Sequence, residues 1–314
     1  MSNIDCLFSS IATVVKSWNC EAVEIIGAGA WWFGFSKPIS EKTDSIWGRV
    51  HAYRYDSWRI LEAFSGIKVT WNDTTEIEEI LPILQVEVAA QRPIIIYINS
   101  HFCPWHPHQK EYYTHFCLVI GMDQENQDLI CNDANPPKYK ERLPFKLFAQ
   151  GCGPCITFAK VDKPDKGTDW REVIQDVIDR LGISTELYSF NLMRRFSEEL
   201  YQEINNCHDR LPAWIEDTVP VVLNVGLLQK GRIYFARTLT YFAEQFGILE
   251  FVSLANRILQ ASQQWNTISF FAVKSRLNPN DRHSLLRIPQ KILEIADFEE
   301  QITFDLISLV NKYS

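Results

Sequence analysis

Residues 5–17 read Asp-Cys-Leu-Phe-Ser-Ser-Ile-Ala-Thr-Val-Val-Lys-Ser, and the rest of the chain is organised around this stretch. Its apolar residues fall at 7, 8, 11, 12, 14 and 15, a spacing typical of a helix with one buried face. Asp5 is an acceptable N-cap, which predicts that Cys6 lies in the first helical turn. Unpaired backbone N–H groups and the positive end of the helix dipole favour a thiolate there, although the neighbouring Asp5 carboxylate opposes it. Cys6 is therefore a candidate nucleophile whose own N–H helps to hold an oxyanion, and a buried structural cysteine is the alternative.

The composition is that of an ordinary globular protein. The chain has 314 residues, which is long enough for two domains with substantial cores. Hydrophobic residues make up 46 % and charged residues 22 %, close to the average of folded domains. The formal net charge is −8, and no extended basic run offsets it, so nucleic acid is not expected as a partner.

The cysteines point to a reducing compartment. Eight are present, and in a chain of this size they are typical of free thiols rather than of a disulfide framework. The apolar stretch at 7–15 lacks the basic start and the small-residue cleavage pattern of a signal peptide. No apolar run reaches the roughly 18 residues of a membrane-spanning helix. We therefore expect a cytoplasmic protein with no membrane association.

The hydrophobic pattern predicts an α+β domain over residues 1–162, with helices first and a mostly antiparallel sheet after them. Thr75 and Glu78 form a capping-box pair that opens a helix running to about Ala90. Expected strands cover 67–71, 94–98, 115–122, 129–133 and 155–161, and expected helices cover 6–17, 21–26 and 55–64.

A polar segment at 162–169 contains Pro and Gly and is the best candidate for a linker. Beyond it almost every stretch has helical periodicity, which predicts an α-helical bundle domain over 168–314. Its expected helices are 169–181, 190–205, 212–228, 232–246, 249–264, 266–276 and 288–313.

The second and third strands of the run from 94 to 133 carry the partners that a cysteine nucleophile needs. A turn at 123–127 makes them an antiparallel hairpin, and a register centred near Glu125 places Asp133 opposite Cys117. His115 is then the diagonal neighbour of Asp133, although a one-residue slip would present Asn132 or Ala134 instead. The order of Cys6, then His115 roughly a hundred residues later, then Asp133 is that of papain-like sites. A histidine satisfied within the sheet is the alternative.

Three stretches resemble the family named for the N-terminal domain of the butirosin-biosynthesis acyltransferase, protein H. They are Asp5-Cys6-Leu7-Phe8-Ser9-Ser10-Ile11-Ala12, Pro93-Ile94-Ile95-Ile96-Tyr97-Ile98 with its aromatic loop, and His115-Phe116-Cys117-Leu118-Val119-Ile120-Gly121-Met122-Asp123 with Cys131-Asn132-Asp133. This family is related to the papain-like, bacteriocin-processing cysteine peptidases. The resemblance covers most of residues 1–162, and the helical part is similar to the family's usual C-terminal partner.

The resemblance implies a papain-like acyltransferase of specialised-metabolite biosynthesis. Cys6 would be the nucleophile, His115 the general base and Asp133 the residue that orients it. The acyl donor would be a thioester on the phosphopantetheine of an acyl or peptidyl carrier protein, the acceptor an amine, and the enzyme would carry no cofactor of its own. The related peptidases carry a Gln about six residues before the nucleophile as an oxyanion donor. Residues 1–5 include no Gln, so the second oxyanion donor is unassigned and Asn3 is the nearest amide side chain.

Aromatic side chains are candidates for a dry substrate pocket, since water competes with an amine for the acyl-enzyme. The glycine-rich stretch 27–35 and the loop after residue 98 supply them, and a purely structural role is the alternative for the first stretch. The expected substrate-binding residues are Trp31, Trp32, Phe33, His101, Phe102 and Trp105.

Other motifs are weaker. Cys152-Gly153-Pro154-Cys155 spells a redox motif but follows a short helix and enters a strand, the reverse of the thioredoxin-like arrangement. His101, Cys103, His106 and His108 have no matching second pair for zinc, so no metal is expected. Lys138, Lys140 and Arg142 could meet an acidic carrier protein or could be a solvated loop.

Two rival functions remain open. The same fold could serve a cysteine peptidase, an amidase or a thioester hydrolase, in which water resolves the acyl-enzyme. It could also serve as a binding module for a carrier protein or a peptide without catalysis.

Overall fold

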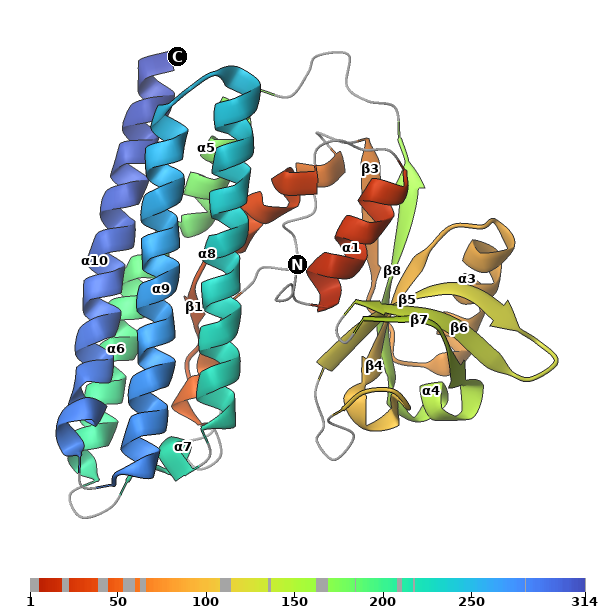
Figure 1. Cartoon of the computed structure of the whole chain (residues 1–314), viewed down its shortest axis with the longest axis horizontal. Helices are drawn as coiled ribbons and strands as arrows, with labels where there is room; N and C mark the ends of the chain where they lie inside the picture. The colour runs from red at the N-terminus through yellow and green to blue at the C-terminus, as the bar shows by residue number, and fades with distance from the viewer. Residues whose placement is uncertain are drawn as a thin grey trace. The chain divides into compact units, whose positions relative to one another are not determined.

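The computed structural model describes the chain as two compact units (Figure 1). Unit 1 comprises Met1–Val23 and Leu61–Gly167, and unit 2 comprises Glu24–Ile60 and Thr168–Ser314. The described residues are 6–18, 23–38, 45–52, 60–62, 66–107, 114–134, 137–161, 169–183, 185–207, 211–216, 218–279 and 281–313.

Unit 1 is built on a six-stranded sheet with strand order β3-β8-β4-β5-β6-β7, in which every neighbouring pair is antiparallel. The expectation of helices with an antiparallel sheet is therefore confirmed for this unit. The strands are β3 Ile67–Asn72, β4 Ile94–Asn99, β5 Thr114–Asp123, β6 Asp128–Ala134, β7 Pro137–Pro144 and β8 Cys152–Lys160.

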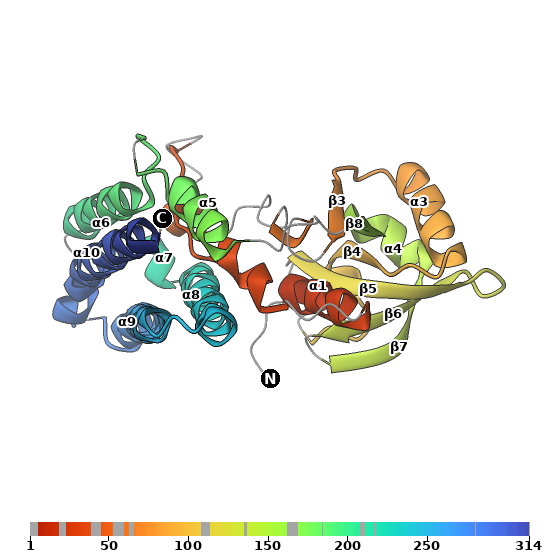
Figure 2. The same ribbon diagram turned by 90° about the horizontal axis from the view of Figure 1, so that it is seen from above.

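Helices cover both faces of this sheet, and Figure 2 shows the sheet between α1 (Cys6–Ser17) and α3 (Ile77–Ala89). The predicted helix at 6–17 is confirmed as α1, which packs against β4, β5 and β6. The α3 side holds a dry core in which Ile80 and Leu84 meet alternate residues of the strands, among them Ile96 and Val119. This core fixes the position of β5 and β6 because a one-residue slip would turn their apolar side chains outward.

Two local expectations for unit 1 differ from the structure. The segment 137–144 is strand β7 rather than the expected solvated loop. Prolines bound it and exposed charged residues fill it, which is also the composition of an edge strand. The expected capping box is wrong: the Thr74 hydroxyl, not Thr75, meets a helix carboxylate, that of Glu79 at 2.6 Å. Of the helix expected at 55–64, Ile60–Glu62 are helical and the remaining positions lie outside the described residues.

Unit 2 is a bundle of long helices, among which α8, α9 and α10 lie side by side in Figure 1. The expected breaks near 230 and 265 are wrong, since 219–246 and 250–277 are each continuous. Across the described residues, no helix is long and apolar enough to cross a membrane. The helices are α5 Trp170–Leu181, α6 Ser189–Asn206, α7 Ala213–Glu216, α8 Val219–Phe246, α9 Glu250–Leu277 and α10 Arg282–Tyr313.

The segment 24–60 belongs to this helical unit, which corrects the expected first domain of 1–162. Its backbone lies directly on α8: a Cβ on Gly231 would be 2.3 Å from the carbonyl oxygen of Ala30. The Thr238 hydroxyl also donates to the carbonyl of Glu24 at 2.6 Å. The segment contributes η1 Val23–Ala30, β1 Gly34–Phe35, η2 Ile46–Arg49 and β2 Val50–His51, with β1 and β2 forming a two-stranded antiparallel sheet. The linker expected at 162–169 lies outside the described residues except for Asp169.

Candidate active site

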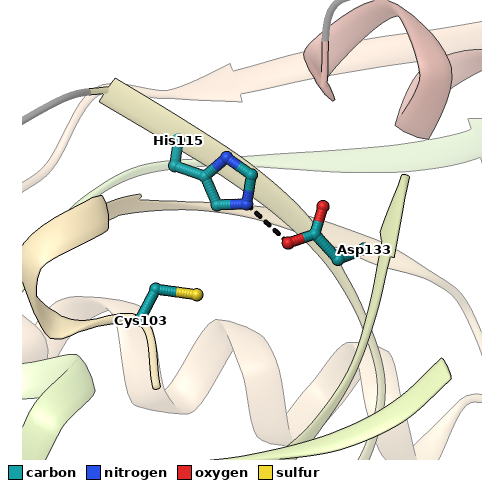
Figure 3. Close-up of side chains that lie close together, drawn as sticks. All are labelled: Cys103, His115 and Asp133. Atoms are coloured by element: carbon teal, nitrogen blue, oxygen red, sulfur yellow. Dashed lines mark hydrogen bonds and ion pairs between the residues drawn. The ribbon is translucent and has the colours of Figure 1, made fainter. Parts of the chain in front are cut away.

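A buried histidine–carboxylate pair lies between β5 and β6 (Figure 3). His115 is the second residue of β5, and Asp133 is near the end of β6. The His115 Nε2 atom is 2.6 Å from Asp133 Oδ2, and each residue is only 3 % exposed. A buried carboxylate with this partner holds the ring in one orientation and stabilises its protonated form.

The strand register that creates this pair was predicted. Leu118 lies opposite Asn132 and Val119 opposite Cys131, which is the register centred near Glu125. An irregularity between Val119 and Gly121 then shifts the turn end of the hairpin by one residue. The shift falls on the far side from His115, so it leaves the geometry at the pair unchanged.

The thiol of Cys6 completes a row of three groups. Cys6 is the first residue of α1 and is half-buried. Its side chain makes a hydrogen bond with His115. Because Nε2 of the ring is engaged by Asp133, Nδ1 is the nitrogen left for this contact. The structure thus brings Cys6, His115 and Asp133 together, whereas Asp5 and Asn3 lie outside the described residues.

The two contacts set the charge of the imidazole. Burial of the ring lowers the pKa of His115, but hydrogen bonds and charge from Asp133 and Cys6 outweigh burial and raise it to about 9 from 6.5. The ring is therefore mostly an imidazolium at neutral pH.

A second cysteine, Cys103, also lies beside the pair and is drawn in Figure 3. Its sulfur and the nearest ligand atoms of His115 and Asp133 all lie within 4.8 Å of one another. Sequence reasoning considered this residue only among possible zinc ligands. Cys103 is fully buried, and burial first, then the charges of Cys117 and Asp133, raise the pKa of its thiol strongly. A thiol held neutral and out of reach is a poor nucleophile, so Cys6 is the better candidate.

Thiol, imidazole and carboxylate are all ligand types for zinc. Here the Nε2 and Oδ2 atoms already bond to each other, and the Cys103 thiol is held in its protonated form. A metal ion would have to break the His115–Asp133 hydrogen bond and remove the proton from the Cys103 thiol. Of the four expected zinc candidates, His101 is exposed on the surface and His108 lies outside the described residues.

The loop after β4 supplies a third contact to the pair. The Trp105 indole Nε1–H donates to Asp133 Oδ2 at 2.7 Å, the same oxygen that meets His115. The His106 ring lies beside the His115 ring, with centroids 4.6 Å apart. Trp105 was expected to line a substrate pocket, and its role as a hydrogen-bond donor to Asp133 has no signal in the sequence beyond its place in an aromatic loop.

The remaining expected substrate-binding residues are dispersed. Trp31 and Phe33 are 1 % and 0 % exposed, in the core of unit 2, where they stack on Phe235 and Trp265, so neither side chain is available to a substrate there. Trp32 is partly buried in the same unit, and its carbonyl accepts from a guanidinium there. His101 stands edge-on to Phe102 in the loop after β4.

The Cys152–Cys155 motif follows α4 (Phe145–Gly151) and opens β8, as the sequence predicted. Both cysteines are free thiols. The register of β8 against β4 shifts between them, so that Cys155 lies opposite Ile96 and Cys152 opposite Ile98, and both cysteines pack against the same core.

The comparisons with known proteins add little to this geometry. No family model and no curated protein matches the chain. Among solved structures it is similar to the N-terminal peptidase C39 like domain of the toxin secretion ATP-binding protein from Vibrio parahaemolyticus. The identity is 11 %, the match covers 50 % of this chain and 98 % of that one, and the TM-score is 0.30. This is a likeness of fold at most and carries no argument about activity, and it does not extend to the butirosin protein H family.

Proposed function

We propose that unit 1 is a cysteine-dependent acyltransferase domain. One observation carries the proposal. Cys6, at the start of α1, is hydrogen-bonded to His115, and His115 is in turn hydrogen-bonded to Asp133. A nucleophile bonded to a base that is itself oriented by a third group is the arrangement of covalent acyl transfer.

In the first half-reaction the Cys6 thiolate attacks the carbonyl carbon of a thioester donor. The backbone N–H of Cys6 and the positive end of α1 help to hold the oxyanion, and Asn3 is the candidate for a second donor. The donor sulfur leaves with its electron pair and takes a proton from the His115 imidazolium. His115 is then neutral and ready to act as a base.

In the second half-reaction an amine replaces the enzyme sulfur. We propose that the acyl donor is the phosphopantetheine thioester of a carrier protein, as the family resemblance implies, and that the enzyme has no cofactor of its own. Lys138 and Lys140 are exposed on the edge strand β7, where they are available to an acidic partner. Arg142 is less available, because it bridges Asp123 and Asp128.

A hydrolase on the same site is the second candidate, because the contacts among Cys6, His115 and Asp133 serve water as well as an amine. A binding module without catalysis is a third reading. The raised pKa of His115 favours a catalytic role over this one, since strongly shifted groups cluster at working sites.

The test is intact mass of the full chain after mixing with a panel of acyl thioesters, including acyl-pantetheine. We expect an acyl-sized adduct that is lost in Cys6→Ala, is formed at least about 100-fold more slowly in His115→Ala, and is discharged by an added amine. Cys103→Ala is the matched control, because it removes the other thiol beside His115 and should retain the adduct.

Two outcomes would overturn parts of the proposal. An adduct that water discharges as fast in the presence of amines as without them would make the protein a hydrolase. An adduct that survives in Cys6→Ala and is lost in Cys103→Ala would move the nucleophile to the other cysteine.

A further inference from the structure

Helix α9 has two apolar faces, and the helical bundle buries one of them. The helix packs against α8 on one side and α10 on the other (Figure 2). Its inner face, which includes Phe251, Ile258, Trp265 and Ala272, is buried. A helix at the surface of a bundle normally carries polar and charged residues on its other face. The outer face of α9 carries a second set of apolar residues instead.

This outer face follows a heptad pattern. From residue 249 to residue 277, its side chains recur at alternating intervals of three and four residues, the spacing of a helix seam that meets another helix. We call these nine positions the outer stripe. Six of them are apolar and are between 38 % and 80 % exposed. The apolar members are Leu249, Val252, Leu259, Phe270, Val273 and Leu277, and the polar members are Asn256, Gln263 and Asn266.

Exposed apolar side chains gather on this part of the chain. Among the described residues, sixteen large hydrophobic side chains are well exposed, and nine of them lie on α8, on α9 or in the turn between these helices. The hydrogen bond from Arg276 to Thr218 places the start of α8 beside the end of α9, so Val222 extends the apolar surface next to Phe270. Single exposed hydrophobic residues are ordinary, whereas a contiguous group marks a contact surface.

The outer stripe also lies in a segment without charge. No charged residue occurs from Ile258 to Val273. About a quarter of the residues of an average globular domain are charged, so a run of this length on a surface helix is unusual. Depletion of charged residues at the centre is the compositional feature that distinguishes protein–protein interfaces from the rest of a surface. The middle of the stripe therefore has the composition of an interface.

The order of residues along the stripe favours a second copy of this chain as the partner. A symmetric dimer uses the same surface of both copies, so that surface must match itself. Both ends of the stripe are apolar and its middle contains Gln263 and Asn266. Apolar ends and polar middles therefore meet whether two stripes run parallel or antiparallel. A side-chain amide both donates and accepts, so it can bond to the same group in another copy.

The area of the stripe fits this partner. A half-exposed side chain of this size offers on the order of 100 Å², so the six apolar members offer roughly 600 Å² in each copy and about 1,200 Å² in two copies. Stable interfaces bury about 1,200–2,000 Å² in total. The three polar members and the rim of the contact add to the apolar part.

We propose that the outer stripe of α9 is the surface through which two copies of this chain associate as a symmetric dimer. The apolar ends supply the stabilisation, because they leave water when the copies meet. The central amides fix the register at some cost in stability, as polar residues do within coiled-coil seams.

The oligomeric state of the full chain tests this proposal. Sedimentation velocity at about 1 to 100 µM protein should show a dimer. Phe270→Asp should raise its Kd at least ~100-fold, because buried aromatic residues dominate interfaces and the substitution acts twice in a symmetric dimer. Phe304→Asp is the matched control and should leave the dimer intact. Phe304 is an exposed residue of α10 one turn after Glu300, whose bond to Arg194 marks the side that faces α6.

A charge exchange distinguishes contact between copies from contact with another protein. Gln263→Glu and Gln263→Lys each place like charges at the middle of the dimer, so each variant alone should associate more weakly than the wild type. An equal mixture of the two should form a dimer with one copy of each. Circular dichroism verifies that the helices persist in every variant.

Four outcomes would overturn the proposal. They are a wild type that stays monomeric over the whole concentration range, a dimer that survives Phe270→Asp, a dimer that Phe304→Asp disrupts as strongly, and a mixture of the Gln263 variants that associates no better than either variant alone.

Discussion

His115 bonds on both sides of its ring, to Asp133 through Nε2 and to Cys6. Burial alone would make it a weaker base than a histidine in water, and the two partners reverse this effect. The chemistry of the site therefore depends on a carboxylate that does not touch the thiol. Trp105 supports this pair in turn, because its indole N–H donates a hydrogen bond to the Asp133 oxygen that contacts His115.

Replacing Asp133 by Asn should lower the pKa of His115 from about 9 by roughly one to two units, because the negative charge is lost while an acceptor remains. NMR titration of the His115 ring signals measures this directly. The same variant should slow acylation of Cys6. A His115 pKa that stays near 9 in Asp133→Asn would contradict the assigned cause.

The raised pKa of His115 also predicts how stability depends on pH. The folded protein holds the His115 proton more tightly than the unfolded chain does, so this contribution is complete below about pH 6.5 and is lost as the pH rises to about 9. Its size is up to about 3 kcal/mol at ~1.4 kcal/mol per unit of pKa. Urea unfolding at pH 6 and pH 9 should show the loss in the wild type and a smaller loss in Asp133→Asn.

At the scale of residues, the sequence could nominate Cys6, His115 and Asp133, because helix periodicity and strand alternation place each of them. It gave no sign that a second thiol, that of Cys103, lies beside His115. The burial that raises the pKa of Cys103 follows from packing of the loop after β4, which the sequence does not reveal.

Among the elements, α8 carries two glycines with opposite surroundings. A Cβ on Gly231 would lie 2.3 Å from the carbonyl oxygen of Ala30, whereas a Cβ on Gly226 would meet nothing within 4 Å. Gly231 is thus required for close approach of the 24–60 segment. By helix propensity alone, either glycine would only destabilise the helix.

The two alanine variants form a matched pair. We expect Gly231→Ala to destabilise unit 2 by about 2 kcal/mol, because the backbone of Ala30 must move. Gly226→Ala should stabilise the protein by up to about 1 kcal/mol, because alanine is the better helix former. Urea unfolding followed by tryptophan fluorescence measures both. Equal effects of the two substitutions would show that the contact with Ala30 does not matter.

At the same scale, the sequence predicted the elements whose pattern is complete within one segment. Strand β4 and helix α1 are of this kind, and both lie where expected. Strand β7 was missed because most of its side chains are exposed, so its sequence does not alternate between apolar and polar residues. The length of α8 was missed because Gly231 reads as a break until the contact with Ala30 is known.

For the molecule as a whole, Glu299 joins the 24–60 segment to the helices within unit 2. This fully buried carboxylate accepts from Arg232 through two bonds, and from the indole N–H groups of Trp31 and Trp265. The Arg232 guanidinium also donates to the carbonyl of Trp32 at 3.0 Å. Each charge in this cluster is paired, which is the condition for keeping it buried.

Glu299→Gln should destabilise unit 2 by about 3–5 kcal/mol, because it leaves the Arg232 charge buried without its partner. Glu300→Gln is the control on the neighbouring residue, whose partner Arg194 is 33 % exposed at its side chain. We expect that substitution to cost less than about 1 kcal/mol. Thermal unfolding of both variants is the measurement, and equal losses would refute the role given to Glu299.

The sequence by itself determined the helix that begins at Cys6, the register that pairs His115 with Asp133, and the helical character of the second unit. Each depends on a hydrophobic periodicity that is visible within one short segment of the chain. The tertiary structure alone decided that Trp105 bonds to Asp133, 28 residues away, and that Trp31 bonds to Glu299, 268 residues away. It therefore also decided that the 24–60 segment belongs to unit 2. No local pattern contains such pairings, because they exist only after separate elements have packed and their polar groups have lost water as a partner.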